Sequence, residues 1–158
     1  MQNKDIFIEL MTKLPTISEK FDMESWRINW GKGGNAELVD ATCGFAGCAI
    51  GWMPALVPAA KERGFYFFYR ESSYQIVPTY KEFEYFRAVA EFFQITDHEA
   101  MWLFDAESYK HPDYDTEEDD DYDCYNNIEV TTEVVVNRMK MFLEKESLPD
   151  NRHPEYIL

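Results

Sequence analysis

The chain has 158 residues, a length that suits a single domain with a buried core. Its formal net charge is −15, from 30 acidic and 15 basic side chains, and this sign disfavours direct binding to nucleic acids and to anionic membranes. Hydrophobic residues make up 46% and aromatic residues 16% of the chain, which excludes global disorder. Because the rings outnumber the needs of a minimal core, we expect some of them to lie at contact surfaces.

The N-terminal third is predicted to form two helices separated by a flexible turn at Gly31, Gly33 and Gly34. Residues 3–14 carry apolar side chains at helical spacing, and Pro15 ends the pattern. Residues 43–54 are apolar and rich in small side chains. Four of these small residues recur three or four positions apart, at Gly44, Gly47, Cys48 and Gly51. Such spacing predicts a buried central helix with one smooth face, kinked or ended near Pro54 and Pro58.

The middle of the chain is predicted to hold a β-hairpin followed by two capped helices. Aromatic and β-branched residues in 65–70 and 74–77 flank the polar turn 71–73, which is typical of a hairpin. Thr79 with Glu82, and Thr96 with Glu99, have the spacing of capping boxes, so each pair is expected to open a helix. Thr131 is expected to cap a last helix that carries an apolar stripe.

Residues 105–129 lose the helical pattern and concentrate the charge. They hold eleven acidic residues against one lysine, so they carry −10 of the total −15. Acidic charge interleaved with tyrosines can steer a basic partner and then anchor it, so we predict that binding specificity lies here. The predicted binding residues are Tyr109, Tyr114, Asp115, Glu117, Glu118, Asp119, Asp120, Asp121, Tyr122 and Asp123. The alternative interpretation is a solvated, self-repelling loop without a partner.

No complete catalytic, metal or cofactor motif is found. Cys43 and Cys48 lack the second pair that a zinc site needs, and Cys124 stands where a calcium loop beginning at Asp119 needs glycine. For His98, at a helix start, capping is favoured over catalysis. We therefore predict no catalytic residue, no metal and no cofactor. The odd count of three cysteines and the polar first ten residues predict free thiols and a cytoplasmic protein.

Several short motifs together resemble a family of small uncharacterised proteins of bacteriophages, bacterial genomes and plasmids. Its core pattern, Cys-Gly-x-x-x-Cys-x-x-Gly-x-x-Pro, matches the chain from Cys43 to Pro54. The other matching positions, in the same order, are Leu14-Pro15, Phe21-Asp22-Met23 with Trp26, Leu103-Phe104, and Thr131 with Arg138-Met139. Trp52 stands where many members have histidine, and the acidic run 115–123 is an insertion relative to the pattern. The resemblance implies a phage context and a fold, but no chemistry.

These observations predict an α+β fold: one mainly helical domain over residues 1–148, with about five helices, one small β-hairpin and a long acidic loop at 105–129. Residues 149–158 are expected to be a flexible tail. The predicted function is a non-enzymatic, phage-type interaction protein that binds and modulates a basic host protein that handles nucleic acid, as an anti-defence or anti-restriction inhibitor would. The alternatives are a small metal- or thiol-dependent enzyme using Cys43, Cys48 or His98, and a structural oligomer subunit.

Overall fold

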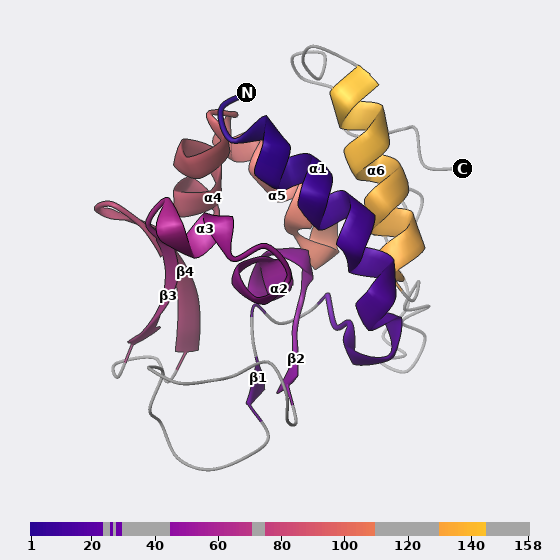
Figure 1. Ribbon diagram of the computed structural model, residues 1–158, viewed down its shortest axis with the longest axis horizontal. Coiled ribbons are helices and arrows are strands. Elements are labelled where there is room, and N and C mark those ends of the chain that lie inside the picture. Colours follow the sequence, from indigo (N-terminus) through magenta and orange to yellow (C-terminus); the bar gives the residue numbers. More distant parts are fainter. Residues whose placement is uncertain (24–25, 27, 30–44, 71–74, 110–129, 145–158) are drawn as a thin grey trace, which may run out of the picture.

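Six α-helices, two short 3-10 helices and five strands make up the part of the chain that the structure describes (Figure 1). The structure, a computed structural model, describes residues 1–23, 26, 28–29, 45–70, 75–109 and 130–144. The helices are α1 (Lys4–Lys13), η1 (Leu14–Lys20), α2 (Ala49–Leu56), α3 (Ala59–Glu62), α4 (Tyr85–Phe93), α5 (Asp97–Phe104), η2 (Ala106–Tyr109) and α6 (Thr132–Glu144). The strands are β1 (Ile28–Asn29), β2 (Phe45–Ala46), β3 (Phe65–Arg70), β4 (Gln75–Tyr80) and β5 (Phe83–Glu84). This single, mainly helical domain with a small sheet confirms the predicted fold class.

The first helix forms where its apolar spacing predicts it. α1 buries Ile6, Phe7 and Leu10 on one side, and the α-helix ends at the residue before Leu14-Pro15. Pro15 then occupies the first turn of the 3-10 helix η1. Proline is tolerated there because the first backbone N–H groups of a helix have no partner within it. After Pro15 the chain therefore continues as a 3-10 helix to Lys20.

The segment 43–54 is only partly helical, which corrects the prediction of one helix with a glycine face. Gly47 belongs to an isolated bridge with Phe21: its N–H donates to Lys20 O at 3.4 Å, and its C=O accepts from Asp22 N at 3.1 Å. Because these backbone groups are used in pairing with η1 and its end, the helix α2 starts only at Ala49. Residues 47–54 are buried as expected, whereas 43–44 lie outside the described residues.

The predicted hairpin is confirmed, and it belongs to a three-stranded antiparallel sheet of order β3-β4-β5. β3 pairs with β4 from Phe65↔Tyr80 to Arg70↔Gln75. The capping box expected at Thr79 is wrong, because Thr79 lies in β4 and pairs with Glu84 of β5. The helix α4 therefore begins only at Tyr85. Lys81 has a φ of 54°, and this left-handed residue makes the tight turn between β4 and β5.

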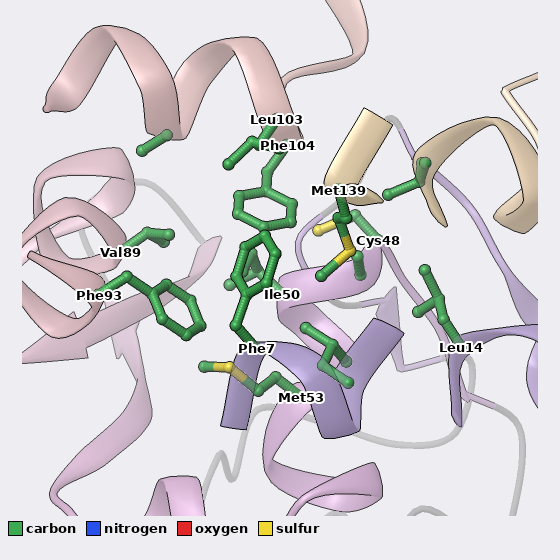
Figure 2. Close-up of a cluster of buried hydrophobic side chains, with 14 of the residues drawn as sticks. Phe7, Leu14, Cys48, Ile50, Met53, Val89, Phe93, Leu103, Phe104 and Met139 are labelled. Carbon is green, nitrogen blue, oxygen red and sulfur yellow. The ribbon is translucent and has the colours of Figure 1, made fainter. Parts of the chain in front are cut away.

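Helix α4 lies between the sheet and the other helices, and two adjacent rings show this. Phe92 packs on the sheet, with ring centroids 4.9 Å from Phe65 and 5.1 Å from Tyr80. Phe93 packs on α1, with its centroid 5.4 Å from that of Phe7 in an edge-to-face arrangement. Figure 2 shows Phe7 beside Phe93 and Phe104 at the centre of the core, to which α1, α2, α4, α5 and α6 contribute.

The two C-terminal helices begin at their predicted caps. At Thr96 the capping box of α5 is complete: Glu99 N donates to Thr96 Oγ1 at 3.1 Å, and Thr96 N donates to Glu99 Oε2 at 2.7 Å. Thr131 Oγ1 accepts a longer bond of 3.4 Å from Val134 N at the start of α6. In Figure 1 the β3–β4 hairpin lies at one side of the molecule and α6 at the other. None of the helices in the described ranges is long and apolar enough to cross a membrane.

Candidate functional site: the base of the acidic segment and an exposed hairpin edge

Of the ten predicted binding residues, the described part of the chain contains only Tyr109. The remaining nine, at positions 114, 115 and 117–123, lie outside the described residues. Tyr109 ends η2 and is only 4% exposed, and its hydroxyl donates to Leu103 O at 2.7 Å. Its ring was expected to lie in the acidic loop facing a partner. In the structure it belongs to the core instead, because the first residues of segment 105–129 fold back on α5 as η2.

Tyr109 packs on an unexpected side chain, the guanidinium of Arg138 from α6. Arg138 is only 3% exposed, and its Cζ lies 3.4 Å from the ring centroid of Tyr109 and 4.8 Å from that of Trp102. Its Nη1 donates to Trp102 O and, at 2.7 Å, to Ser108 Oγ, while Nη2 donates to Ser108 O at 2.9 Å. The cation thus has both rings and oxygen acceptors around it. These contacts tie η2 and α5 to α6.

One acceptor of Arg138, Trp102 O, belongs to the C-terminal end of α5, and Ser108 of η2 supplies the other two, which explains why a cation is tolerated there. The last carbonyls of a helix have no partner within it and carry the negative end of its dipole. Here Asp105 N donates to Met101 O at 2.8 Å, and Ser108 Oγ donates to Trp102 O at 2.9 Å. Arg138 also donates to Trp102 O, while Tyr109 donates to the next carbonyl, Leu103 O. The α5–η2–α6 corner is therefore a helix C-cap built by tertiary contacts.

Burial sets the protonation states of this corner. Loss of solvation lowers the pKa of Arg138 to about 10, and the neighbouring Tyr109 partly opposes this change. Loss of solvation also raises the pKa of Tyr109 well above its usual value, while the charge of Arg138 acts in the opposite direction. Near neutral pH Arg138 is thus charged and Tyr109 is neutral. Neither group exchanges a proton there, so the corner can anchor the chain but is not suited to acid–base catalysis.

Arg138 was missed as a structural residue, although the sequence held a signal. It lies three residues after Val135 and four before Phe142, both of which are buried, so helical spacing alone places it on the apolar side of α6. A lone arginine on such a stripe is unusual, because charged side chains are rarely fully buried unless they are paired. Its partners Trp102 and Ser108 lie 36 and 30 residues earlier in the chain, and helical spacing does not reveal contacts at that separation.

A second surface feature lies on the hairpin at the other side of the molecule. Tyr66 and Phe68 are 46% and 52% exposed, while Phe65, on the opposite face of β3, is fully buried. This alternation follows from the two-residue period of a strand. β3 is one of the two outer strands of the described sheet, so the two exposed rings belong to an edge strand. The other exposed large hydrophobic residues in the described ranges, Met1, Ile8 and Met101, are not aromatic.

Of the candidate enzymatic residues Cys43, Cys48 and His98, the structure describes Cys48 and His98. Cys48 is a free, buried cysteine whose Sγ lies 4.0 Å from Trp26 O, and burial raises its pKa to about 11. His98 is exposed in the first turn of α5. Cys43 and Cys124 lie outside the described residues. Within the described ranges there is no group of three or more His, Cys, Asp or Glu side chains that is arranged to hold a metal ion.

Comparison of the chain with protein-family models, with curated proteins and with solved structures gives no match in any of the three. The phage-family resemblance therefore stays a prediction. The features of the molecule that bear on function are therefore the acidic segment, the corner that holds its first residues, and the exposed hairpin edge.

Proposed function

We propose that this protein is a non-enzymatic, phage-type interaction protein that binds a basic host protein that handles nucleic acid and inhibits it. The observation that carries this proposal is the charge of residues 105–129, where eleven acidic residues accompany one lysine. A groove that binds nucleic acid presents Lys and Arg side chains, so a dense acidic segment has the complementary potential. Inhibition of a defence or restriction system is the version that best fits the phage context.

The described residues support this proposal through the place where the segment begins. Tyr109, the last described residue before the gap, is fixed by its ring contact with Arg138 and its bond to Leu103 O. Val130, the first described residue after the gap, directly precedes the cap of α6, the helix that carries Arg138. The described chain thus stops at the corner itself and resumes at the N-terminal end of α6, the helix that supplies Arg138. Since Tyr109 is buried, anchoring to a partner falls to Tyr114 and Tyr122 among the predicted tyrosines.

The thiol version of the enzymatic alternative finds no support at Cys48. A cysteine nucleophile acts as the thiolate, and a pKa of about 11 in a buried position keeps this group protonated. A reactive cysteine usually lies in electropositive, partly exposed surroundings. The Cys48 side chain is buried, and none of its described contacts places it at a cleft.

The test is affinity capture from a host lysate, followed by direct binding measurements with the captured protein. Replacing the five acids at 117–121 with Ser and Asn is expected to weaken binding several-fold, mainly through slower association, and to flatten its salt dependence. Competing DNA is expected to displace the protein if both use the same groove. Folding should change little, because like charges in one segment repel each other.

A matched control separates the acidic segment from overall charge. Glu19, Glu62, Glu82, Glu133 and Glu144 are exposed and lie outside segment 105–129, so replacing these five with Gln changes the net charge by the same amount. We expect this control to retain affinity and most of the salt dependence. Equal losses in both variants would mean that the net charge alone matters, and unaltered affinity in the 117–121 variant would contradict the proposal.

A further inference from the structure

The hairpin edge differs from the rest of the molecule in both charge and chemistry. Residues 58–84 contain four basic and four acidic side chains, so this 27-residue region is neutral while the remainder of the chain carries the whole net charge of −15. The same region holds eight aromatic residues, five of them consecutive in β3. Both exposed aromatic rings of the described surface, Tyr66 and Phe68, belong to it.

The backbone of β3 adds a second property. β3 pairs with β4 on one side and is the outer strand of the described sheet, so its other side presents N–H and C=O groups at an edge. Natural sheets usually guard such edges with lysine, proline or a bulge. β3 has no proline, and its one charged residue, Arg70, is at its last position. An aromatic edge with so little protection is a template for pairing with another strand.

From these observations we infer that two copies of this chain associate through β3, edge to edge, in an antiparallel two-fold arrangement that extends the sheet across the dimer. Antiparallel pairing is self-complementary in donors and acceptors, so one surface serves both copies. Tyr66 and Phe68 point to the same face of β3, so this pairing brings the rings of the two copies together on that face.

Charge complementarity favours a second copy over a highly charged partner at this edge. Two chains of −15 repel each other wherever their acidic surfaces meet, and they repel least where the surface is neutral. Lys61, Glu62 and Arg63 precede β3, and Arg63 already pairs with Asp5 at 2.5 Å. The antiparallel arrangement sets this mixed-sign end of one copy against Arg70, the last residue of β3, in the other copy, so no strongly acidic surface opposes another there.

The salt dependence of this association separates it from the proposed function. Salt screens the repulsion between two acidic chains, so dimer formation is expected to strengthen as the ionic strength rises. Binding of a basic partner to the acidic segment is expected to weaken under the same change. Failure of one inference therefore leaves the other standing.

The experiment is analytical ultracentrifugation of the full chain over micromolar to millimolar concentrations, together with hydrogen exchange at both extremes. We expect a reversible dimer and increased protection of the β3 amides at high concentration. Tyr66→Ser combined with Phe68→Ser should raise the dimer dissociation constant at least about tenfold. Ile8→Ser combined with Met101→Ser is the control, because those side chains are similarly exposed, at 41% and 44%, on α1 and α5.

Three results would overturn the inference: a monomer at every concentration and salt level, an equal loss of dimer in both double variants, or a dimer without added protection of β3. If a lysine-rich peptide protects β3 while the chain stays monomeric, the edge serves a basic partner and the inference is also wrong. Phe68→Lys, which places a charge near the two-fold axis, is the second variant if the double serine variant fails to fold.

Discussion

The α5–η2–α6 corner buries a charged side chain, whereas the hairpin edge exposes aromatic side chains. Both are the opposite of what these residue types usually do. Arg138 in the corner is 3% exposed, whereas Phe68 on β3 is 52% exposed. The guanidinium is buried because Trp102 O and Ser108 supply acceptors and two rings cover its faces. Phe68 stays exposed because it points to the face of β3 opposite to the buried Phe65. Burial of a side chain therefore depends on the partners available at its position as well as on its residue type.

The largest expected effect comes from two phenylalanines of the same strand. Phe65 is fully buried against Phe92, with ring centroids 4.9 Å apart, so Phe65→Ala is expected to cost about 3–5 kcal/mol of unfolding free energy. Phe68→Ala should change it by no more than about 0.5 kcal/mol, because the side chain is half exposed. Urea unfolding at low protein concentration, where the proposed dimer is absent, measures both. Similar losses in the two variants would contradict the described faces of β3.

The corner is tested next by Arg138→Ala, for which we expect a loss of about 3 kcal/mol of unfolding free energy. The substitution removes the donor to Ser108 O at 2.9 Å and to Trp102 O, and it leaves a gap beside the ring of Tyr109. Arg138→Met fills much of this volume without a charge, so it should cost less. Chemical denaturation of both variants measures the difference. If both cost less than about 1 kcal/mol, the corner does not hold the three elements together.

A smaller effect concerns pH. Burial raises the pKa of Cys48 from 9.0 to about 11. Cys48 also contributes to the raised pKa of the nearby Tyr109. A raised pKa in the folded state means that the stability due to the neutral thiol is complete below pH 9 and is lost as the pH rises through 11. We expect the wild-type chain to lose about 2 kcal/mol more than Cys48→Ala over this interval. Unfolding curves of the two proteins across the interval test this; parallel pH profiles would contradict the buried thiol.

The smallest expected change in unfolding free energy concerns the two ends of α5. Its N-terminus is capped locally, by the reciprocal bonds of Thr96 and Glu99, whereas its C-terminus is capped by η2 and α6. Thr96→Ala should therefore cost about 1 kcal/mol, less than Arg138→Ala. Thr96→Ser keeps the accepting oxygen and should cost little, which makes it the control. Thermal unfolding of the three proteins is sufficient, and a loss in Thr96→Ser equal to that in Thr96→Ala would mean that the cap bond is unimportant.

Much of the fold was predictable wherever the signal lies within a few residues. The α-helical part of 3–14 and its proline stop, the hairpin at 65–77, and the caps at Thr96 and Thr131 all appear in the structure. Of the predicted binding residues, Tyr109 alone is described, and its ring is buried. Local charge and composition marked the acidic segment but carried no information on which of its first residues fold back as η2.

The amino-acid pattern alone predicts the fold class, the segregation of charge, and those helices and strands whose start and stop signals are local, because turn, cap and periodicity effects act over three or four residues. Packing in three dimensions, in contrast, sets the start of α2 at Ala49, the pairing of Thr79 in a strand, and the burial of Arg138. In each case the deciding contact lies beyond the three or four residues over which local signals act: Thr79 pairs with Glu84 across a turn, Gly47 with Lys20 across 27 residues, and Arg138 with Trp102 across 36 residues. Backbone and cationic groups that lose water must find partners, and which partner is in reach depends on how the chain packs.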